Sequence, residues 1–282
     1  MLMSAENTFG YVTGNVLSTR PASPFGTSIT PGNNTYGSYT EILSDASVVR
    51  DCYGIMININ GIFVSTAAKD SLTTIGIDTA GGTAYVDFIS GLLSSCAGPY
   101  LQGCGGHWYY FPVFIPSGTA IAAKGSVNNG TVGTQSVAIW LYGAPSHPHN
   151  IFVGSGVESI GVVAATSKGT NVTSGTASEG AWTSLGSTTK NCKFWQMGMG
   201  INDGTMTTGQ SYHTDLSYGD GTNQVMIDRD KKYDVNSSSE VLECGLRMPS
   251  CVNVPIGGTI YGRMQCSGTA DSGTSMAAYG VY

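Results

Sequence analysis

The chain has 282 residues, only 11% of them charged, and a formal net charge of −6. Soluble domains average about 25% charged residues, so hydroxyls, amides and the backbone of 40 glycines must cover much of this surface. Twelve scattered Lys and Arg residues cannot neutralise a row of phosphates, which argues against a nucleic-acid partner. No stretch approaches the ~20 apolar residues of a membrane span, while 41% hydrophobic residues indicate a folded chain.

Short apolar or alternating runs, rich in β-branched and aromatic residues, predict strands along the whole chain. In the first half they lie at 53–60, 74–77, 84–89, 108–115, 119–124 and 136–142. In the second half they lie at 194–201, 224–227, 240–248, 259–265 and 276–282. Pro112 and Pro116 predict an edge strand or a bulge in the fourth run. Only 48–50 and 190–193 are expected to form single helical turns, so the pattern predicts an antiparallel β-sandwich, preferably a jelly roll.

A repeated segment indicates that one domain has been duplicated. The stretch 26–42 recurs without a gap as 169–185, with six of the seventeen positions identical. Further along, 115–124 matches 254–263. A similar spacing maintained over such a length is typical of a duplicated domain. We therefore predict two tandem β-sandwiches, at 1–143 and 150–282, with a short and fairly stiff Pro-rich linker at 144–149.

The residues that the two copies share are those of turns and packing. Besides Gly, Thr and Pro, the copies share an aromatic residue (Tyr39 or Trp182) and a basic residue (Lys124 or Arg263). None of these is a nucleophile matched with a base, and no catalytic or phosphate-binding motif is present. The sequence therefore predicts a protein that is not an enzyme and that needs no cofactor.

Two groups of residues are candidate metal ligands. His147 and His149 lie in the linker without a Cys or carboxylate cluster at ligand spacing, so we interpret them as linker residues. Asp220, Asp228 and Asp230 are close in sequence but lack the twelve-residue pattern of a hand-type calcium loop. We interpret these three as turn residues and a solvated strand end, and predict no metal site.

The seven cysteines are an odd number and include no CxxC pair. Cys96 with Cys104, or Cys244 with Cys251, are the candidate disulfides under oxidising conditions. The first residues lack the basic region and apolar core of a signal peptide. We therefore favour free, partly buried thiols and leave both pairings open.

Two runs resemble virion structural proteins of tailed bacteriophages. The run 111–124 (FPVFIPSGTAIAAK), followed by Tyr142 and Gly143, looks like a motif of these proteins, and 30–42 resembles the upstream half of the same domain. The resemblance covers most of the first copy, and the second copy diverges at 248–255. It implies a particle component that is assembled in the host cytoplasm and located in the virion.

Within that class, the first expectation is a capsid decoration (cement) protein that bridges capsomers. Its partners would be the major capsid protein or other virion proteins, and it would be a homo-oligomer with no membrane or nucleic-acid partner. An N-terminal arm at about 1–25 supplies the candidate capsid contacts Phe9, Tyr11, Val12, Val16 and Leu17. Because Phe9 recurs at the same spacing as Phe152, the alternative is that this segment is an ordinary first strand.

The second expectation is a tail or head fibre that binds a receptor or glycan. Tyr100 and Trp108 are candidate residues for stacking on sugars, and the Gly-rich insertion 97–106 of the first copy is a natural place for specificity. The alternative for Trp108 is a strand that places alternate aromatics in the core. A virion-associated polysaccharide hydrolase would need a buried carboxylate pair in a cleft, and a bacterial surface lectin shares the same fold class.

Overall fold

The structure is a computed structural model that describes residues 10–12, 26–60, 70–95, 106–128, 134–143, 152–201, 209–235, 241–243, 250–269 and 273–282. Strands dominate these ranges, and their only helical segments are two short 3-10 turns, η1 (Asp45–Ser47) and η2 (Ala164–Thr166). No helix in them has the length and apolar character that crossing a membrane requires. The strands form four sheets, which we call A, B, C and D.

Sheets A and B form the first sandwich. Sheet A has the order β1-β10-β5-β8, with β2 also paired with β10, and sheet B has the order β3-β9-β6-β7, with β4 also paired with β9. The strands of sheet A are β1 (Gly10–Val12), β2 (Thr27–Ile29), β5 (Cys52–Asn60), β8 (His107–Phe111) and β10 (Gln135–Gly143). Those of sheet B are β3 (Gly32–Asn33), β4 (Thr40–Leu43), β6 (Asp70–Asp78), β7 (Val86–Ser95) and β9 (Ala120–Val127).

Sheets C and D form the second sandwich. Sheet C has the order β12-β13-β21-β15-β19, with β11 also paired with β21, and sheet D has the order β14-β20-β16-β17-β18. The strands of sheet C are β11 (Val157–Ile160), β12 (Val162–Val163), β13 (Lys168–Asn171), β15 (Cys192–Ile201), β19 (Ser250–Val254) and β21 (Thr274–Val281). Those of sheet D are β14 (Thr183–Ser187), β16 (Gln210–Gly219), β17 (Gln224–Val235), β18 (Val241–Glu243) and β20 (Thr259–Cys266).

The two sandwiches have the same topology. In the first, the eight principal strands form the antiparallel sheets β2-β10-β5-β8 and β4-β9-β6-β7; in the second they form β13-β21-β15-β19 and β14-β20-β16-β17. Each pair of sheets follows the eight-stranded, two-sheet arrangement of a jelly roll. The predicted all-β fold of duplicated antiparallel sandwiches is confirmed. The predicted domain limits stay a prediction, because the linker 144–149 lies outside the described residues.

One loop before the second principal strand is built alike in both copies. The Gly37 amide donates to the Gly125 carbonyl at 2.9 Å, and the Gly180 amide donates to the Met264 carbonyl at 2.8 Å. A Cβ on Gly37 or Gly180 would overlap a backbone oxygen, which explains why this repeat retains glycine. The spacing of 143 residues seen in the sequence therefore also relates equivalent places in the fold.

The alternating pattern of each strand decides which side chains form the core. On β8, His107, Tyr109 and Phe111 are buried, while Trp108 and Tyr110 point to the other face and are half-buried. This alternation confirms the interpretation of the aromatic run as a strand that places every second side chain in the core. The strand also lies at the edge of sheet A, as the prolines beside it predicted.

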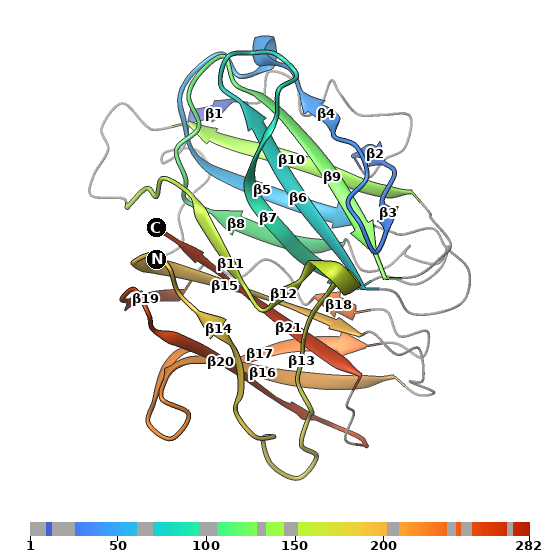
Figure 1. Cartoon of the computed structure of the whole chain (residues 1–282), viewed down its shortest axis with the longest axis vertical. Helices are drawn as coiled ribbons and strands as arrows, with labels where there is room; N and C mark the ends of the chain where they lie inside the picture. Colours follow the sequence, from blue (N-terminus) through green and yellow to red (C-terminus); the bar gives the residue numbers. More distant parts are fainter. Residues whose placement is uncertain are drawn as a thin grey trace.

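Sheet C lies between the first sandwich and sheet D (Figure 1). Its strands β11 and β15 contact β7 of sheet B. Alternate residues of β21 divide between two cores: Tyr279 and Val281 pack in the hydrophobic cluster of the first sandwich, and Met276 and Ala278 in that of the second. We call this contact between sheet C and the β7–β8 side of the first sandwich the seam. It makes the two sandwiches one packed block.

Candidate functional site

The outward side of sheet A carries a group of aromatic rings. Trp108 on β8 and Trp140 on β10 stack with ring centroids 5.2 Å apart and ring planes 29° apart. Beside them, Tyr110 and Tyr142 meet edge to face with centroids 5.8 Å apart. All four side chains are half-buried. We call these four rings, with Met56, the aromatic face.

The central strand β5 makes room for these rings. The Tyr110 ring lies over Gly54, where any Cβ would overlap it. The Tyr142 hydroxyl donates to the Met56 sulfur at 3.5 Å. Strands β5, β8 and β10 contain no Asp, Glu, Lys or Arg. Surfaces rich in Tyr, Trp and Met and depleted of charge have the composition of a protein-interface core, and aromatic rings also stack on sugars.

The structure places only some of the residues singled out in the sequence. Trp108 lies on the aromatic face beside Trp140, which the sequence did not single out. Tyr11 and Val12 lie in β1 and pair with Tyr142 and Leu141 of β10, so this part of the predicted arm is a strand of sheet A. The other candidates lie outside the described residues: Phe9, Val16, Leu17 and Tyr100.

A second feature is a cation–aromatic cluster on sheet B. The Lys124 ammonium lies 2.7 Å from Asp87 Oδ1 and 4.5 Å from the centroid of the Tyr39 ring. The Tyr39 hydroxyl also donates to Asp87. Partial burial raises the pKa of Asp87, but the hydrogen bonds from Lys124 and Tyr39 outweigh it, so the net shift of this pKa is downward.

The equivalent cluster on sheet D is more buried. Arg263 Nη2 lies 2.7 Å from Asp215 Oδ2 and 2.8 Å from Glu179 Oε2. Its guanidinium carbon lies 4.3 Å from the centroid of the Trp182 ring. The two aromatic–basic pairs shared by the copies are therefore in contact in both sandwiches. The aromatic residue precedes β4 or β14, and the basic residue lies on the neighbouring strand, β9 or β20. Each contact therefore stabilises the packing of these two strands.

Three carboxylates gather around Arg263. Glu179, Asp215 and Asp230 offer oxygens that all lie within 4.8 Å of one another, a geometry that could hold a metal ion. The guanidinium of Arg263 already supplies a cation to two of them. Asp220 is a turn residue, as predicted, since its side chain accepts from the amides of Thr222 and Asn223 at 2.9 and 2.7 Å. The arrangement is that of an ion-pair network.

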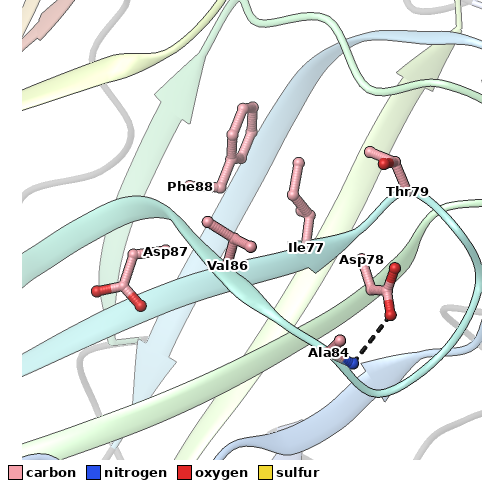
Figure 2. Close-up of a pocket in the computed structure, with 7 residues that line it drawn as sticks. All are labelled: Ile77, Asp78, Thr79, Ala84, Val86, Asp87 and Phe88. Carbon is pink, nitrogen blue, oxygen red and sulfur yellow. Dashed lines mark hydrogen bonds between the residues drawn. The ribbon is translucent and has the colours of Figure 1, made fainter.

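A hollow of about 260 Å³ lies beside the turn between β6 and β7 (Figure 2). Its lining consists of Ile77, Asp78, Thr79, Ala84, Val86, Asp87 and Phe88. Asp78 accepts from the amides of Ala80 and Ala84, both at 2.9 Å, and Asp87 is held by Lys124. Both carboxylates of the hollow thus accept hydrogen bonds within the chain, and those of Asp78 stabilise the turn.

The described cysteines include buried thiols. Burial, with Asp51 nearby, raises the pKa of Cys52 to about 11, and burial beside Glu158 raises the pKa of Cys192 to about 12. Thiols with such pKa values stay protonated and unreactive at neutral pH. Both candidate disulfides remain predictions, because Cys96, Cys104 and Cys244 lie outside the described residues.

The fold and its surfaces define a class: a tandem jelly-roll protein whose two sandwiches share a seam. No protein-family model matches the chain, and no curated protein matches it.

Solved structures give distant likenesses. PNGF-II aligns over 92% of the chain at 11% identity with a TM-score of 0.34. Tripeptidyl peptidase 2 aligns over 99% of the chain at 9% identity with a TM-score of 0.26. VP2 of infectious bursal disease virus, in a subviral particle, aligns over 88% at 12% identity with a TM-score of 0.21. The chain spans 66%, 23% and 59% of these chains respectively. Such low scores carry no argument about function.

Proposed function

We propose that the chain is a structural protein of a virion, and within that class a capsid decoration protein that stabilises the head by bridging capsomers. The observation that carries the proposal is the seam. A bridging protein must hold its two contact surfaces at a fixed separation, and a hydrogen-bonded, buried contact between the two sandwiches does this. The phage-like runs in the sequence support the same class.

The seam is continuous through backbone as well as side chains. The Gly154 amide donates to the Pro112 carbonyl at 2.8 Å, and the Phe114 amide donates to the Gly154 carbonyl at 3.0 Å. At the centre, the Tyr279 hydroxyl donates to the Gly91 carbonyl at 2.9 Å and accepts from the Leu93 amide at 2.7 Å. Because these bonds are made by both sandwiches, neither can turn without breaking buried polar contacts.

Charge is unevenly divided over the block, which suggests its orientation on a particle. Strands β5, β8 and β10 of sheet A carry none of the four charged residue types. In contrast, β17 of sheet D by itself carries five charged residues that are exposed or half-buried: Asp228, Arg229, Asp230, Lys232 and Asp234. We propose that the aromatic face meets the major capsid protein or another virion protein, and that sheet D faces solvent.

Replacing Trp140 on the aromatic face with Ala should reduce co-sedimentation with capsids at least tenfold, because aromatic residues at the centre of an interface commonly contribute 2 kcal/mol or more. Circular dichroism would show that the variant is folded. Lys232→Ala on sheet D is the matched control and should bind as the wild type does. Equal binding by the Trp140 variant would remove the aromatic face from the proposal.

The predicted arm is tested separately. Deletion of residues 1–20 should abolish capsid binding while leaving a folded protein, if the candidate contacts act as an arm. Because β1 pairs with β10, the deletion also removes one edge strand of sheet A, so its folding must be checked by circular dichroism and thermal melting. Retained capsid binding by the folded deletion variant would rule out the arm.

A fibre protein that binds glycans is the second candidate, and the stacked pair Trp108 and Trp140 favours it. A glycan array and adsorption to host cells would separate the two functions. Binding to a sugar that is lost in Trp108→Ala, together with density on the tail in electron cryomicroscopy of particles, would support the fibre. Density over capsomer junctions with no sugar bound would support decoration.

A further inference from the structure

A carboxylic acid is buried at the seam. Asp70, the first residue of β6, has no exposed surface. Its Oδ2 accepts a hydrogen bond from the Ser275 hydroxyl of β21 at 2.8 Å, so the contact joins the two sandwiches. Among the described residues, Oδ1 has no hydrogen-bond partner. Gly200 of β15 lies directly against the carboxyl group, and a Cβ there would overlap it.

Within the part of the chain that the structure describes, few charged groups surround this carboxyl. On β7, the neighbour is Ser95, whose hydroxyl accepts from the Ile201 amide at 3.2 Å. On β8, the buried His107 has its Nε2 3.3 Å from the Ser95 amide nitrogen. On β13, the positive charge of Lys168 acts on Asp70. The contacts from β15 and β21 come from uncharged residues, Gly200 and Ser275.

We propose that Asp70 makes the seam sensitive to protons: the seam is most stable when the carboxyl is neutral and weakens when it ionises. An ionised carboxylate needs several donors to replace water. Among the described residues, Ser275 donates a hydrogen bond to Oδ2 and Oδ1 accepts none, while Ser95 and the Ile201 amide favour the ionised form more weakly. The neutral acid does not need that solvation. This property is independent of whether the protein decorates a capsid or forms a fibre.

The direction of the pH effect follows from the pKa. Burial raises the pKa of Asp70 to about 7, although Ser275, Ser95 and the charge of Lys168 act to lower it. The folded chain therefore keeps a proton that the unfolded chain releases near its ordinary value of 3.8. Stability from this group is fully present below about pH 4, falls as the pH rises towards about 7, and is gone above it.

Infrared difference spectroscopy measures the protonation of Asp70 directly. The wild type should show the band of a protonated carboxylic acid at pH 6 that disappears with a midpoint near pH 7. Asp70→Asn should lack the band, and the exposed-site control Asp45→Asn should keep it. Ser275→Ala should move the midpoint to higher pH, because it removes the donor that favours the ionised form.

Thermal melting then measures what the proton does to the seam. Between pH 5 and pH 8 the melting temperature of the wild type should fall, relative to that of Asp70→Asn, by on the order of 10 °C. Hydrogen exchange of the Tyr279 and Leu93 region should speed up with pH in the wild type only. No protonated-carboxyl band at pH 6, or the same pH dependence in Asp70→Asn, would overturn the proposal.

Discussion

Arg263→Met is expected to lower the free energy of unfolding by about 3–5 kcal/mol, the usual cost of removing one partner from a buried ion pair. Its guanidinium pairs with Asp215, whose side chain is only 3% exposed, and with Glu179. The Met side chain keeps an apolar stem at this position but removes the guanidinium that lies over the Trp182 ring, and it leaves the Asp215 carboxylate without its cation. Thermal melting and urea denaturation would measure the loss, which should amount to roughly 10 °C.

The duplicated fold supplies the control. Lys124 occupies the equivalent place in the first sandwich, but its partner Asp87 has a side chain that is 46% exposed. Water can solvate that carboxylate once the ammonium is gone, so Lys124→Met should cost about 0–1 kcal/mol. The same substitution type at equivalent positions thus separates the effect of burial from that of charge pairing.

A rescue experiment identifies the unpaired charge as the cause. Asp215→Asn added to Arg263→Met should recover a large part of the lost stability, because it removes the charge that was left unpaired. If Arg263→Met and Lys124→Met lose the same free energy of unfolding, the ion-pair explanation fails. It also fails if adding Asp215→Asn lowers the stability of Arg263→Met further. Loss of the cation–aromatic contact with Trp182 would then account for the lower stability.

The strand pattern of the chain could be predicted because it is local. The runs at 53–60 and 136–142 alternate in the sequence and become the central strands β5 and β10. By contrast, β13 and β14 are short and contain mostly Ser, Thr, Gly and other polar residues, so their composition is that of loops. They form strands because a neighbouring strand accepts their backbone hydrogen bonds.

One expected helical turn was wrong for the same reason. The segment 190–193 leads into β15, which begins at Cys192 and pairs with Val254 of β19. Local propensity favoured a turn there, but tertiary pairing decided otherwise. The other expected turn, 48–50, directly follows η1, so its position was wrong by only a few residues.

The seam had no signal in the sequence. Every second residue of β21 and β15 faces the first sandwich, yet most residues on both faces of these strands are apolar or small, as in a strand buried on two sides. From the sequence alone, Gly198 would be expected to weaken its strand. The structure shows instead that a Cβ there would overlap the Tyr109 hydroxyl. The duplication suggested two independent cores. Only the fold shows that residues of β21 in the second sandwich pack in the core of the first.

Only part of the aromatic face could be predicted from the sequence, for a similar reason. Trp108 stood out because it lies in a run of adjacent aromatic residues, whereas Trp140 lies between Ile139 and Leu141 in a mostly apolar strand. The register of β5 against β8 and β10 brings the two rings together across the sheet. Pairing between distant strands creates this contact, so no local pattern could have predicted it.

Tyr279→Ala is expected to destabilise both sandwiches at once, by about 3–5 kcal/mol. The ring is fully buried, with its centroid 5.4 Å from that of Tyr109 and 6.2 Å from that of Phe111. Truncation leaves a cavity at the seam and removes the hydrogen bonds to Gly91 and Leu93. Tyr279→Phe keeps the ring and should cost about 1–3 kcal/mol, the penalty for leaving those backbone groups unpaired.

Calorimetry with hydrogen exchange shows where the loss falls. In the wild type, the shared core should make the block unfold in one transition. Tyr279→Ala should lower that transition and increase exchange in β7 of the first sandwich as well as in β15 of the second. Met264→Ala, inside the second sandwich alone, is the matched control and should increase exchange mainly there. If Tyr279→Ala left β7 as protected as in the wild type, the seam could not be what holds the two sandwiches at a fixed separation, and the bridging proposal would lose its support.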